Sequence, residues 1–368
     1  MKGKIILIAT FIVVLMLPSI LMFTNWEESY KGVENRKLTE VNFRTLKEAK
    51  RSVINLKNFY KDNFGTRFFL YNFYKKNISE RFNESPSNSK ILLGQNGWLF
   101  LGDSFNNAFS KSKGNLVFKN EELVVIKENL SIIKDWCKKN KTEIFINAVP
   151  GKHTVYKENL PYKINEQRTQ LDQFKQIYPE LIDLRDLFEV KKEKQLYFKT
   201  DSHWNQFGAF EAYLKVMQEF KTRNSGIKML TPKNIDSIVY INSRIGDLNV
   251  ILDRTAREKE PKMFLKNSLG KSVSKKIEVP FYHRLNKESY EERYVNDLAL
   301  NDMKIVLLRD SFSDFSKDFF RATFSEVVFV YNHQFDRTIL LNEKPDIILY
   351  EIGERFIDRF LKIFDLSK

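Results

Sequence analysis

The longest apolar stretch of the chain lies at its N-terminus. Residues 5–23 read IILIATFIVVLMLPSILMF, a run of 19 residues without a charged side chain. About 20 apolar residues in a helix are enough to cross the hydrocarbon core of a bilayer. Two lysines precede the run and two glutamates follow it. The positive-inside rule therefore predicts an anchor over residues 1–27, with its N-terminus in the cytoplasm.

A cleaved signal peptide is the alternative reading of this stretch. Its apolar core would be about 7–15 residues long and would end near small residues. The run here is longer, and no Ala-x-Ala pattern stands near its end. We therefore expect an uncleaved single-pass anchor in the cytoplasmic membrane, with residues 24–368 on the extracytoplasmic, periplasmic side.

Residues 28–88 are rich in charged and aromatic side chains. The segment FYKDNFGTRFFLYNFYKKNISERF places its aromatic residues at helical spacing, which predicts a membrane-proximal helical stem. NESPSNSK at 83–90 is a turn-rich break and a plausible domain boundary. The remaining residues, 89–368, are expected to form one domain.

The pattern of this domain alternates between helical and strand periods. Apolar residues share one face of a helix over 121–139, and a second helix begins near Asn205. Two more helices are expected, one from about residue 313 and one after residue 352. Two short strands surround an Asn-Gly turn in ILLGQNGWLFLGD. Apolar runs predict further strands at 143–149, 180–184, 195–199, 303–308, 326–331 and 346–352. This alternation predicts an α/β fold, with a parallel sheet flanked by helices.

Composition agrees with a folded domain that needs no disulfide. The chain is 42% hydrophobic and 14% aromatic, which is enough to build a sizeable core. Its single cysteine, Cys137, excludes an intramolecular disulfide and a cysteine-rich metal site. We expect no metal and no other cofactor.

The formal net charge is +14. Nucleic acid is one partner for a basic chain, but the expected extracytoplasmic location argues against it. A lysine-rich proteome, an acidic polymer and an anionic membrane surface remain open explanations. Residues 254–276 carry eight basic and two acidic side chains and are expected to form an exposed loop, within a variable insertion of about 222–300. LGKS at 269–272 is not a P-loop, because Leu265 stands where that motif requires glycine.

Two polar clusters follow predicted strands, where ligands bind in α/β sheets. In FKTDSHWNQFG, Asp201 and His203 are two residues apart and would point to the same side of an extended backbone. An aspartate beside a histidine can orient it as a general base. In the second cluster, Asp310-Ser311-Phe312 follows IVLL and opens a helix, where unpaired backbone N–H groups can bind an oxyanion.

Each cluster also has a purely structural interpretation. Asp-x-His before a helix is often a capping arrangement, and a serine at a helix start is more often a cap than a nucleophile. The two clusters in one chain, each at a strand end, favour a site over either structural interpretation alone. A rival nucleophile is Ser104, in the earlier block Gly102-Asp103-Ser104.

The segments TDSHWNQFGAFEAY and LLRDSFSDF together resemble alginate O-acetyltransferases and related DHHW-type proteins, an SGNH-hydrolase-like family. ENRKLTEV, NFGTR, NGWLFL, VPGKHTVYKENLP, RIGDL and KPDIILYEIGER are similar to the same family and occur in its order. The resemblance covers about residues 34–356. It implies an SGNH-hydrolase-like fold, preceded here by the membrane helix and the stem.

The resemblance also implies which residues react. Asp201, His203 and Ser311 match the family's catalytic triad, and the early Gly-Trp-Leu-Phe-Leu block is structural in that family, which disfavours Ser104. One departure is Arg309, which replaces a glycine that often precedes Asp-Ser.

The implied reaction is a double displacement through an acyl-serine. We expect the N–H of Phe312 to donate to the oxyanion, with Asn205 or Asn332 as a second donor. Lys152 and Tyr350 either line the site or serve the core or the surface. Trp204 either stacks on a sugar ring or is buried beside the triad.

The family transfers acetyl groups to hydroxyls of an exported polysaccharide, and it works with a membrane-bound O-acyltransferase that passes acetyl groups outward. Both are therefore expected partners here. A carbohydrate or lipid esterase would use the same triad with water as acceptor, and a non-catalytic polysaccharide-binding scaffold is a third possibility. The sequence does not separate transfer from hydrolysis.

Overall fold

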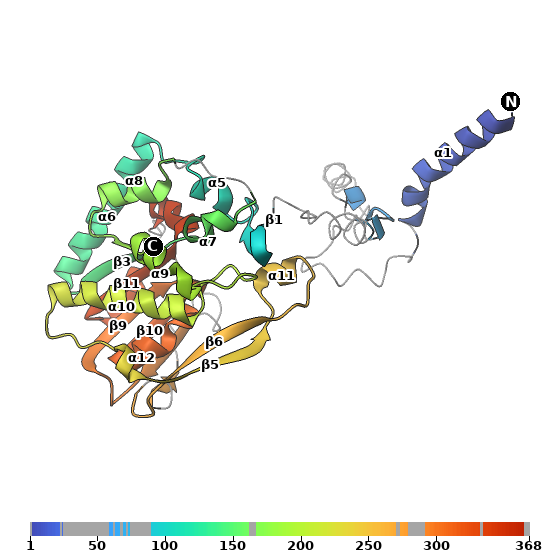
Figure 1. Cartoon of the computed structure of the whole chain (residues 1–368). Coiled ribbons are helices and arrows are strands. Elements are labelled where there is room, and N and C mark those ends of the chain that lie inside the picture. Colours follow the sequence, from blue (N-terminus) through green and yellow to red (C-terminus); the bar gives the residue numbers. More distant parts are fainter. Residues whose placement is uncertain are drawn as a thin grey trace. The chain divides into compact units, whose positions relative to one another are not determined.

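The computed structural model describes residues 2–22, 24, parts of 59–73, 90–161, 167–269, 273–278, 291–331 and 334–363. The chain divides into two units, Met1–Pro86 and Ser87–Lys368 (Figure 1). In the first unit, the predicted apolar helix is confirmed as α1 (Lys2–Leu21). Within the described ranges it is the one helix long and apolar enough to cross a membrane. Most of the predicted stem, 28–88, lies outside the described residues.

The second unit is built on a seven-stranded sheet with the order β4-β3-β11-β9-β10-β8-β7. The first five strands of this order are parallel, whereas β8 runs antiparallel to β10 and β7 antiparallel to β8. The expectation of a wholly parallel sheet is therefore corrected to a mixed one. The strands are β3 (Glu143–Val149), β4 (Ile182–Asp183), β7 (Lys275–Ile277), β8 (Glu291–Val295), β9 (Asn301–Arg309), β10 (Phe324–Tyr331) and β11 (Ile347–Gly353).

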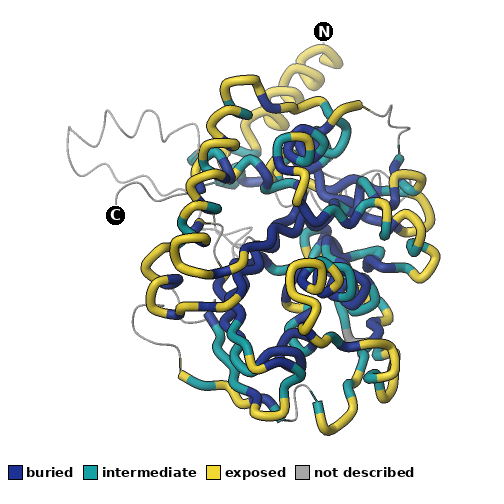
Figure 2. Tube along the Cα trace, turned by 90° about the vertical axis from the view of Figure 1, so that its left-hand side faces the viewer, coloured by how far each residue is buried: buried dark blue, intermediate teal, exposed yellow. Residues whose placement is uncertain are grey.

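Helices cover both faces of this sheet (Figure 1). Successive residues of a strand point to opposite faces, so Ile305 and Leu307 of β9 pack on one side and Val306 and Leu308 on the other. One face is covered by α10 (Gln206–Arg223) and α12 (Lys317–Thr323). The opposite face is covered by α6 (Asn120–Lys139), α8 (Gln170–Ile177), α13 (Arg337–Glu343) and the 3₁₀ helix Glu354–Lys362. The strands between them are almost continuously buried (Figure 2).

Shorter elements lie around this sandwich. The predicted hairpin is confirmed as β1 (Ile91–Leu93) and β2 (Leu99–Leu101), and its turn uses positive φ angles at Asn96 and Gly97. The remaining short helices are α5 (Ala108–Ser112), α7 (Lys152–Val155), α9 (Arg185–Lys191) and α11 (Asp247–Ile251), and short 3₁₀ turns lie at Gln95–Gly97, Lys157–Asn159, Lys192–Lys194 and Pro232–Asn234.

The predicted insertion contains a second sheet. Strands β5 (Ile235–Arg244) and β6 (Glu258–Leu265) pair antiparallel, with α11 in their connection. The expectation of an exposed loop over 254–276 is therefore wrong for β6 and for β7. The predicted insertion also contains β8, so it contributes two strands, β7 and β8, to the main sheet.

Several predicted boundaries shift. The strand predicted at 180–184 is only β4, and the helix predicted from about residue 313 begins earlier, as the 3₁₀ helix Ser311–Phe315 before α12. The C-terminal helix is a 3₁₀ helix. The strand predicted at 195–199 is wrong, because this extended segment joins no sheet and makes only an isolated bridge between Tyr197 and Trp204. Its polar backbone groups are bonded by side chains and by separate backbone groups of several segments.

Candidate active site

The structure brings Asp201, His203 and Ser311 into one hydrogen-bonded chain. His203 Nδ1 lies 2.7 Å from Asp201 Oδ1, and His203 Nε2 lies 2.7 Å from Ser311 Oγ. Asp201 is 1% exposed, and the His203 side chain is 14% exposed. Serine, histidine and carboxylate are thus in contact in the order that activates a serine hydroxyl.

The second carboxylate oxygen of Asp201, Oδ2, accepts hydrogen bonds from residues on either side of the turn between β5 and α11. Arg244 donates from Nε at 3.0 Å and from a terminal nitrogen at 2.9 Å to Asp201 Oδ2, and the backbone N–H of Asp247 donates to the same atom at 3.0 Å. Burial alone would raise the pKa of Asp201, but the hydrogen bond and charge of His203, together with Arg244, lower it overall. The carboxylate therefore stays ionised next to the imidazole.

Two long side chains bond much of the extended segment before Asp201, which receives one backbone hydrogen bond from β2, from the N–H of Leu99 to the carbonyl of Lys199 at 2.9 Å. Lys152 Nζ donates to the carbonyls of Phe198, Lys199 and Asp201 at 2.7–3.1 Å. Glu258 accepts from the backbone N–H groups of Lys199 and Thr200 and from the Thr200 hydroxyl. Buried backbone groups must be bonded somewhere, and here these two side chains bond groups that a continuous sheet ladder would otherwise bond.

Gly246 lies directly against this segment. A Cβ at Gly246 would come within 2.0 Å of the carbonyl oxygen of Thr200, so only glycine fits between α11 and the segment that carries Asp201. This close approach also brings the N–H of Asp247 onto Asp201. Ser202 completes the turn by donating from its backbone N–H to Asp247 Oδ1 at 2.7 Å.

Ser311 stands on a turn that Asp310 holds in place. Asp310 Oδ1 accepts from the N–H of Phe312 at 2.9 Å, and its Oδ2 accepts from the N–H of Gly353 at 2.8 Å, which joins the ends of β9 and β11. Trp204 Nε1 donates to the carbonyl of Phe312 at 2.8 Å. No acceptor for the backbone N–H of Ser311 is found among the described residues. The departure at Arg309 is accommodated, because its side chain turns back to Asp314 and to the carbonyl of Asp310.

The predicted oxyanion donors require correction. The N–H of Phe312 is already bonded to Asp310, so it is not free in this conformation. Asn205 caps α10, with its side-chain oxygen accepting from Phe207 and Gly208 and its amide donating to Gln195. Asn332 lies outside the described residues.

The other predicted site residues have structural positions. Trp204 is fully buried, so it packs beside the triad and does not present a face to a sugar. Lys152 supports the Asp201 segment from the core. Tyr350 is 1% exposed and packs against Phe360, in the core on the α6 side of the sheet. Ser104 is exposed in the turn after β2, and no hydrogen bond from it is found within the described ranges.

Asp201, His203 and Asp247 form a cluster whose side-chain donor atoms all lie within 4.8 Å of one another. Distance alone would allow a metal ion there. The guanidinium of Arg244, however, already neutralises Asp201, and Ser202 bonds Asp247 through both its N–H and its hydroxyl. The donor set is thus occupied by protein groups and does not fit a metal site.

An open pocket of about 250 Å³ lies over the reacting pair. His203 and Ser311 form part of its wall, and Phe315 lies against the His203 ring with 6.1 Å between ring centres. The other residues around it are polar: Gln206, Arg244, Glu260, Lys262 and Asp314. Several come from β5 and β6, so the predicted insertion forms one wall of the pocket.

Sequence reasoning missed Arg244, Asp247 and Glu258 as parts of the site. The first two lie in RIGDL, a segment that resembles the family but carries no obvious chemistry by itself. Nothing in the sequence marks Glu258 as part of the site, because a glutamate within a basic stretch is typical of a solvated surface.

Comparison with known proteins agrees with this architecture. A family model described as "SGNH hydrolase-like domain, acetyltransferase AlgX" matches residues 91–278, just over half of the chain. A search of curated protein sequences finds no match.

Among solved structures, Bacillus cereus PatB1 with a sulfonyl adduct aligns with a TM-score of 0.56 at 18% identity, covering 75% of this chain and 100% of that one. A DHHW family protein from Eubacterium siraeum aligns with a TM-score of 0.53 at 13% identity, covering 77% and 97% of the two chains. At such identities the likeness shows the fold, whereas the match over residues 91–278 shows the family. The chain belongs to the SGNH-hydrolase-like AlgX acetyltransferase family.

Proposed function

We propose that this protein is an O-acetyltransferase that moves acetyl groups onto hydroxyls of an exported polysaccharide through an acetyl-Ser311 intermediate. The observation that carries the proposal is the uninterrupted contact from Asp201 through His203 to Ser311 at the edge of an open pocket. Family membership supports the reaction class. A scaffold with a decayed site would not need to keep this geometry.

In the first half-reaction, His203 Nε2 takes the proton of Ser311 while Ser311 Oγ attacks the carbonyl carbon of the acetyl donor. We assign the N–H of Ser311 as a donor to the negative charge that develops on the carbonyl oxygen. When the bond to the donor breaks, His203 returns the proton to the leaving oxygen or sulfur. The product of this step is acetyl-Ser311, with neutral His203.

In the second half-reaction, a sugar hydroxyl replaces the departed donor. His203 takes its proton, the sugar oxygen attacks the acetyl carbon, and Ser311 leaves and recovers the proton. Asp201 stays anionic throughout and stabilises the imidazolium that forms twice. Arg244 and Lys152 contribute by keeping Asp201 and its segment in place.

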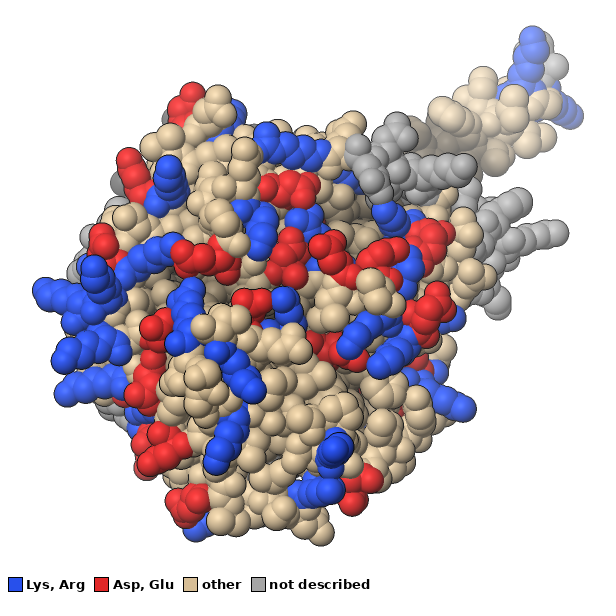
Figure 3. Space-filling view, turned by 60° about the vertical axis from the view of Figure 1, so that its left-hand side comes forward, with Lys and Arg blue, Asp and Glu red and all other residues tan. Residues whose placement is uncertain are grey.

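Water competes with the sugar for acetyl-Ser311 at roughly 55 M, so transfer needs an acceptor that is held in line. The open, polar pocket bordered by β5 and β6 supports the binding of a chain that extends beyond the reacting hydroxyl. On the face in Figure 3, Lys and Arg are interspersed with Asp and Glu, and several basic side chains gather at its left edge.

The acetyl donor and the location are part of the proposal. Acetyl-CoA is confined to the cytoplasm, so an extracytoplasmic enzyme requires a membrane-bound O-acyltransferase to pass acetyl groups outward. α1 would anchor the domain to the same membrane. A carbohydrate or lipid esterase is the second candidate, because the open pocket also admits water to the same triad.

The test compares transfer with hydrolysis. The full-length protein in detergent is given a chromogenic acetyl ester, with and without acidic and neutral oligosaccharides. Mass spectrometry should detect acetylated oligosaccharide with the wild type and none with Ser311→Ala. If every oligosaccharide yields only free acetate at an undiminished rate, the esterase function replaces the transferase.

A further inference from the structure

A second, smaller cavity lies beside the triad, and two residues that adjoin the triad in sequence help to line it. Ser202, which precedes His203, and Phe312, which follows Ser311, both line it. Its volume is about 30 Å³, roughly two to three times what one buried water requires. Part of its wall is apolar and comes from β2, α5 and β3: Leu101, Ala108 and Val149. The cavity is therefore sized for a group of a few heavy atoms with an apolar end.

Most ionisable groups that line this cavity already have partners. Lys152 donates to three carbonyls. Glu354 Oε2 accepts from the N–H of Gly151 and the hydroxyl of Thr154, whereas Glu354 Oε1 is buried without a partner among the described residues. His153 bonds the carbonyl of Leu101, and burial lowers its pKa to about 4, so it is neutral. Lys111 pairs with Asp358 at 2.7 Å.

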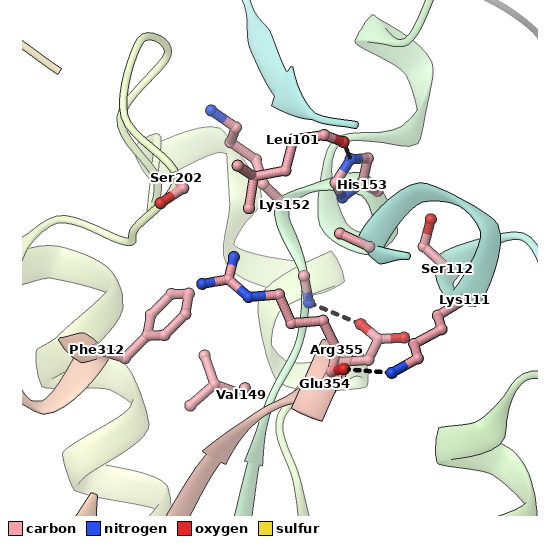
Figure 4. A pocket seen from close by; sticks show the side chains of 13 residues that line it. Leu101, Lys111, Ser112, Val149, Lys152, His153, Ser202, Phe312, Glu354 and Arg355 are labelled. Carbon is pink, nitrogen blue, oxygen red and sulfur yellow. Dashed lines mark hydrogen bonds between the residues drawn. The ribbon is translucent and has the colours of Figure 1, made fainter. Parts of the chain in front are cut away.

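Arg355 is different. Within the part of the chain that the structure describes, its guanidinium has no hydrogen bond and no ion pair, and it only stacks on the ring of Phe356 at 4.6 Å. In Figure 4 it extends from the end of β11 towards Phe312 and Ser202. Burial lowers the pKa of Arg355, and the charges of Asp310 and Asp247 act against this shift. A guanidinium that lines a cavity and has no bonded anion can form an ion pair with an anion that enters it.

We propose that this cavity binds a short-chain carboxylate, acetate first of all, with Arg355 as its anion-binding residue. The planar guanidinium matches a carboxylate with two parallel hydrogen bonds. The apolar wall takes the methyl group, and the small volume excludes long acyl chains. The ligand is the carboxylate that hydrolysis of acetyl-Ser311 releases, in which water supplies the new oxygen and Ser311 recovers its hydroxyl. The identity of the ligand thus rests on the acetyl-Ser311 intermediate of the proposed function, with water in place of the sugar as acceptor.

The experiment measures acetate binding to full-length Ser311→Ala protein in detergent, by saturation-transfer NMR and calorimetry. The substitution removes turnover, so binding is scored even if the transferase proposal fails. Arg355→Gln in this background should raise the acetate Kd at least tenfold, and Arg355→Lys should raise it less. Arg359→Gln is the matched control, because Arg359 stacks on the same Phe356 ring at 4.6 Å without lining the cavity, and it should leave the Kd unchanged.

Two further arms identify the ligand. Ala108→Val fills the apolar wall without touching Arg355 and should weaken acetate as well. Acetate should bind more tightly than butyrate, sulfate or phosphate. The proposal is overturned if Arg355→Gln binds acetate as the parent does, if Ala108→Val has no effect, or if sulfate and phosphate bind as tightly as acetate, which would indicate a general anion site.

Discussion

Arg244 binds the carboxylate of Asp201 through two nitrogens, at 3.0 and 2.9 Å, to the oxygen that faces away from His203. The triad carboxylate is therefore shared between the imidazole and a cation from a different sheet. Arg244 itself lies between two rings, 5.0 Å from that of Phe198 and 5.1 Å from that of Phe315. Arg244 thus joins the small sheet of β5 and β6 directly to the triad.

Arg244→Gln should therefore weaken both fold and activity. A buried carboxylate would lose a charged partner, which costs about 1–3 kcal/mol once the partial exposure of Arg244 is considered. Because the folded-state pKa of Asp201 is lowered, its contribution to stability is present above its unfolded pKa and is lost as the pH falls. Acid unfolding of the variant should begin at a higher pH, as measured by circular dichroism. Arg254→Gln, in the same connection but without contact to Asp201, should match the wild type, and an unchanged acid profile in Arg244→Gln would contradict this role.

Lys152→Met should disturb the segment that carries Asp201. Three carbonyls would lose the donor that they share. Lys152 is only 3% exposed, so water cannot easily replace it. We expect a loss of about 2–4 kcal/mol of unfolding free energy and a large fall in kcat for a chromogenic acetyl ester. Lys215→Met is the comparison, since it removes only a surface pair with Glu219 worth about 0.3–0.5 kcal/mol. Equal denaturation midpoints for the two variants would show that Lys152 does not support the segment.

We expect the free energy of unfolding to depend on pH through the buried carboxyl of Glu351. Burial raises its pKa from 4.5 to about 7, in a site where Ser313 donates to Oε1 and Asn147 to Oε2. The folded state therefore holds a proton that the unfolded state has released between pH 4.5 and 7, and the contribution of Glu351 to stability falls as the pH rises through this window.

Glu351→Gln keeps the shape and removes this titration. The new amide N–H can donate to Asn147 Oδ1, which lacks a partner among the described residues, once the Asn147 amide turns over. The variant should be more stable than the wild type at pH 8, by on the order of 3 kcal/mol at most, and the difference should shrink at pH 5. Thermal melts at the two pH values measure this, and a constant difference would mean that Glu351 does not titrate in this range.

Sequence patterns predicted most of the sheet because its buried strands are continuous apolar runs, as in β3, β9 and β11. They failed for 195–199, where the apolar residues Leu196, Tyr197 and Phe198 are buried but the backbone is bonded by Lys152 and Glu258. Periodicity reports which side chains are buried, and it does not report what bonds the backbone.

The same limit applies to the site. Asp201, His203 and Ser311 could be singled out because a strand end and a motif coincide at each. Arg244 could not, since the spacing of charges in sequence does not reveal a partner 43 residues away. The Phe312 N–H was expected to be free because helix starts leave donors unpaired, but Asp310 acts as a cap one residue before the nucleophile.

The anchor predicts a defined topology. If α1 is an uncleaved span with its N-terminus in the cytoplasm, protease added to spheroplasts should digest the outer domain while a cytoplasmic marker survives. Sequencing of the mature protein should find the original N-terminus. A mature chain that begins after Phe23 would instead indicate a cleaved signal peptide.

The central claim is that Ser311 forms the acyl-enzyme. The most direct measurement is mass spectrometry of peptides from full-length protein that is quenched in acid during turnover of a chromogenic acetyl ester. We expect an acetyl group on Ser311 in the wild type and in Ser104→Ala, and neither adduct nor turnover in folded Ser311→Ala. An acetyl group on Ser104, or continued turnover in Ser311→Ala, would contradict the account.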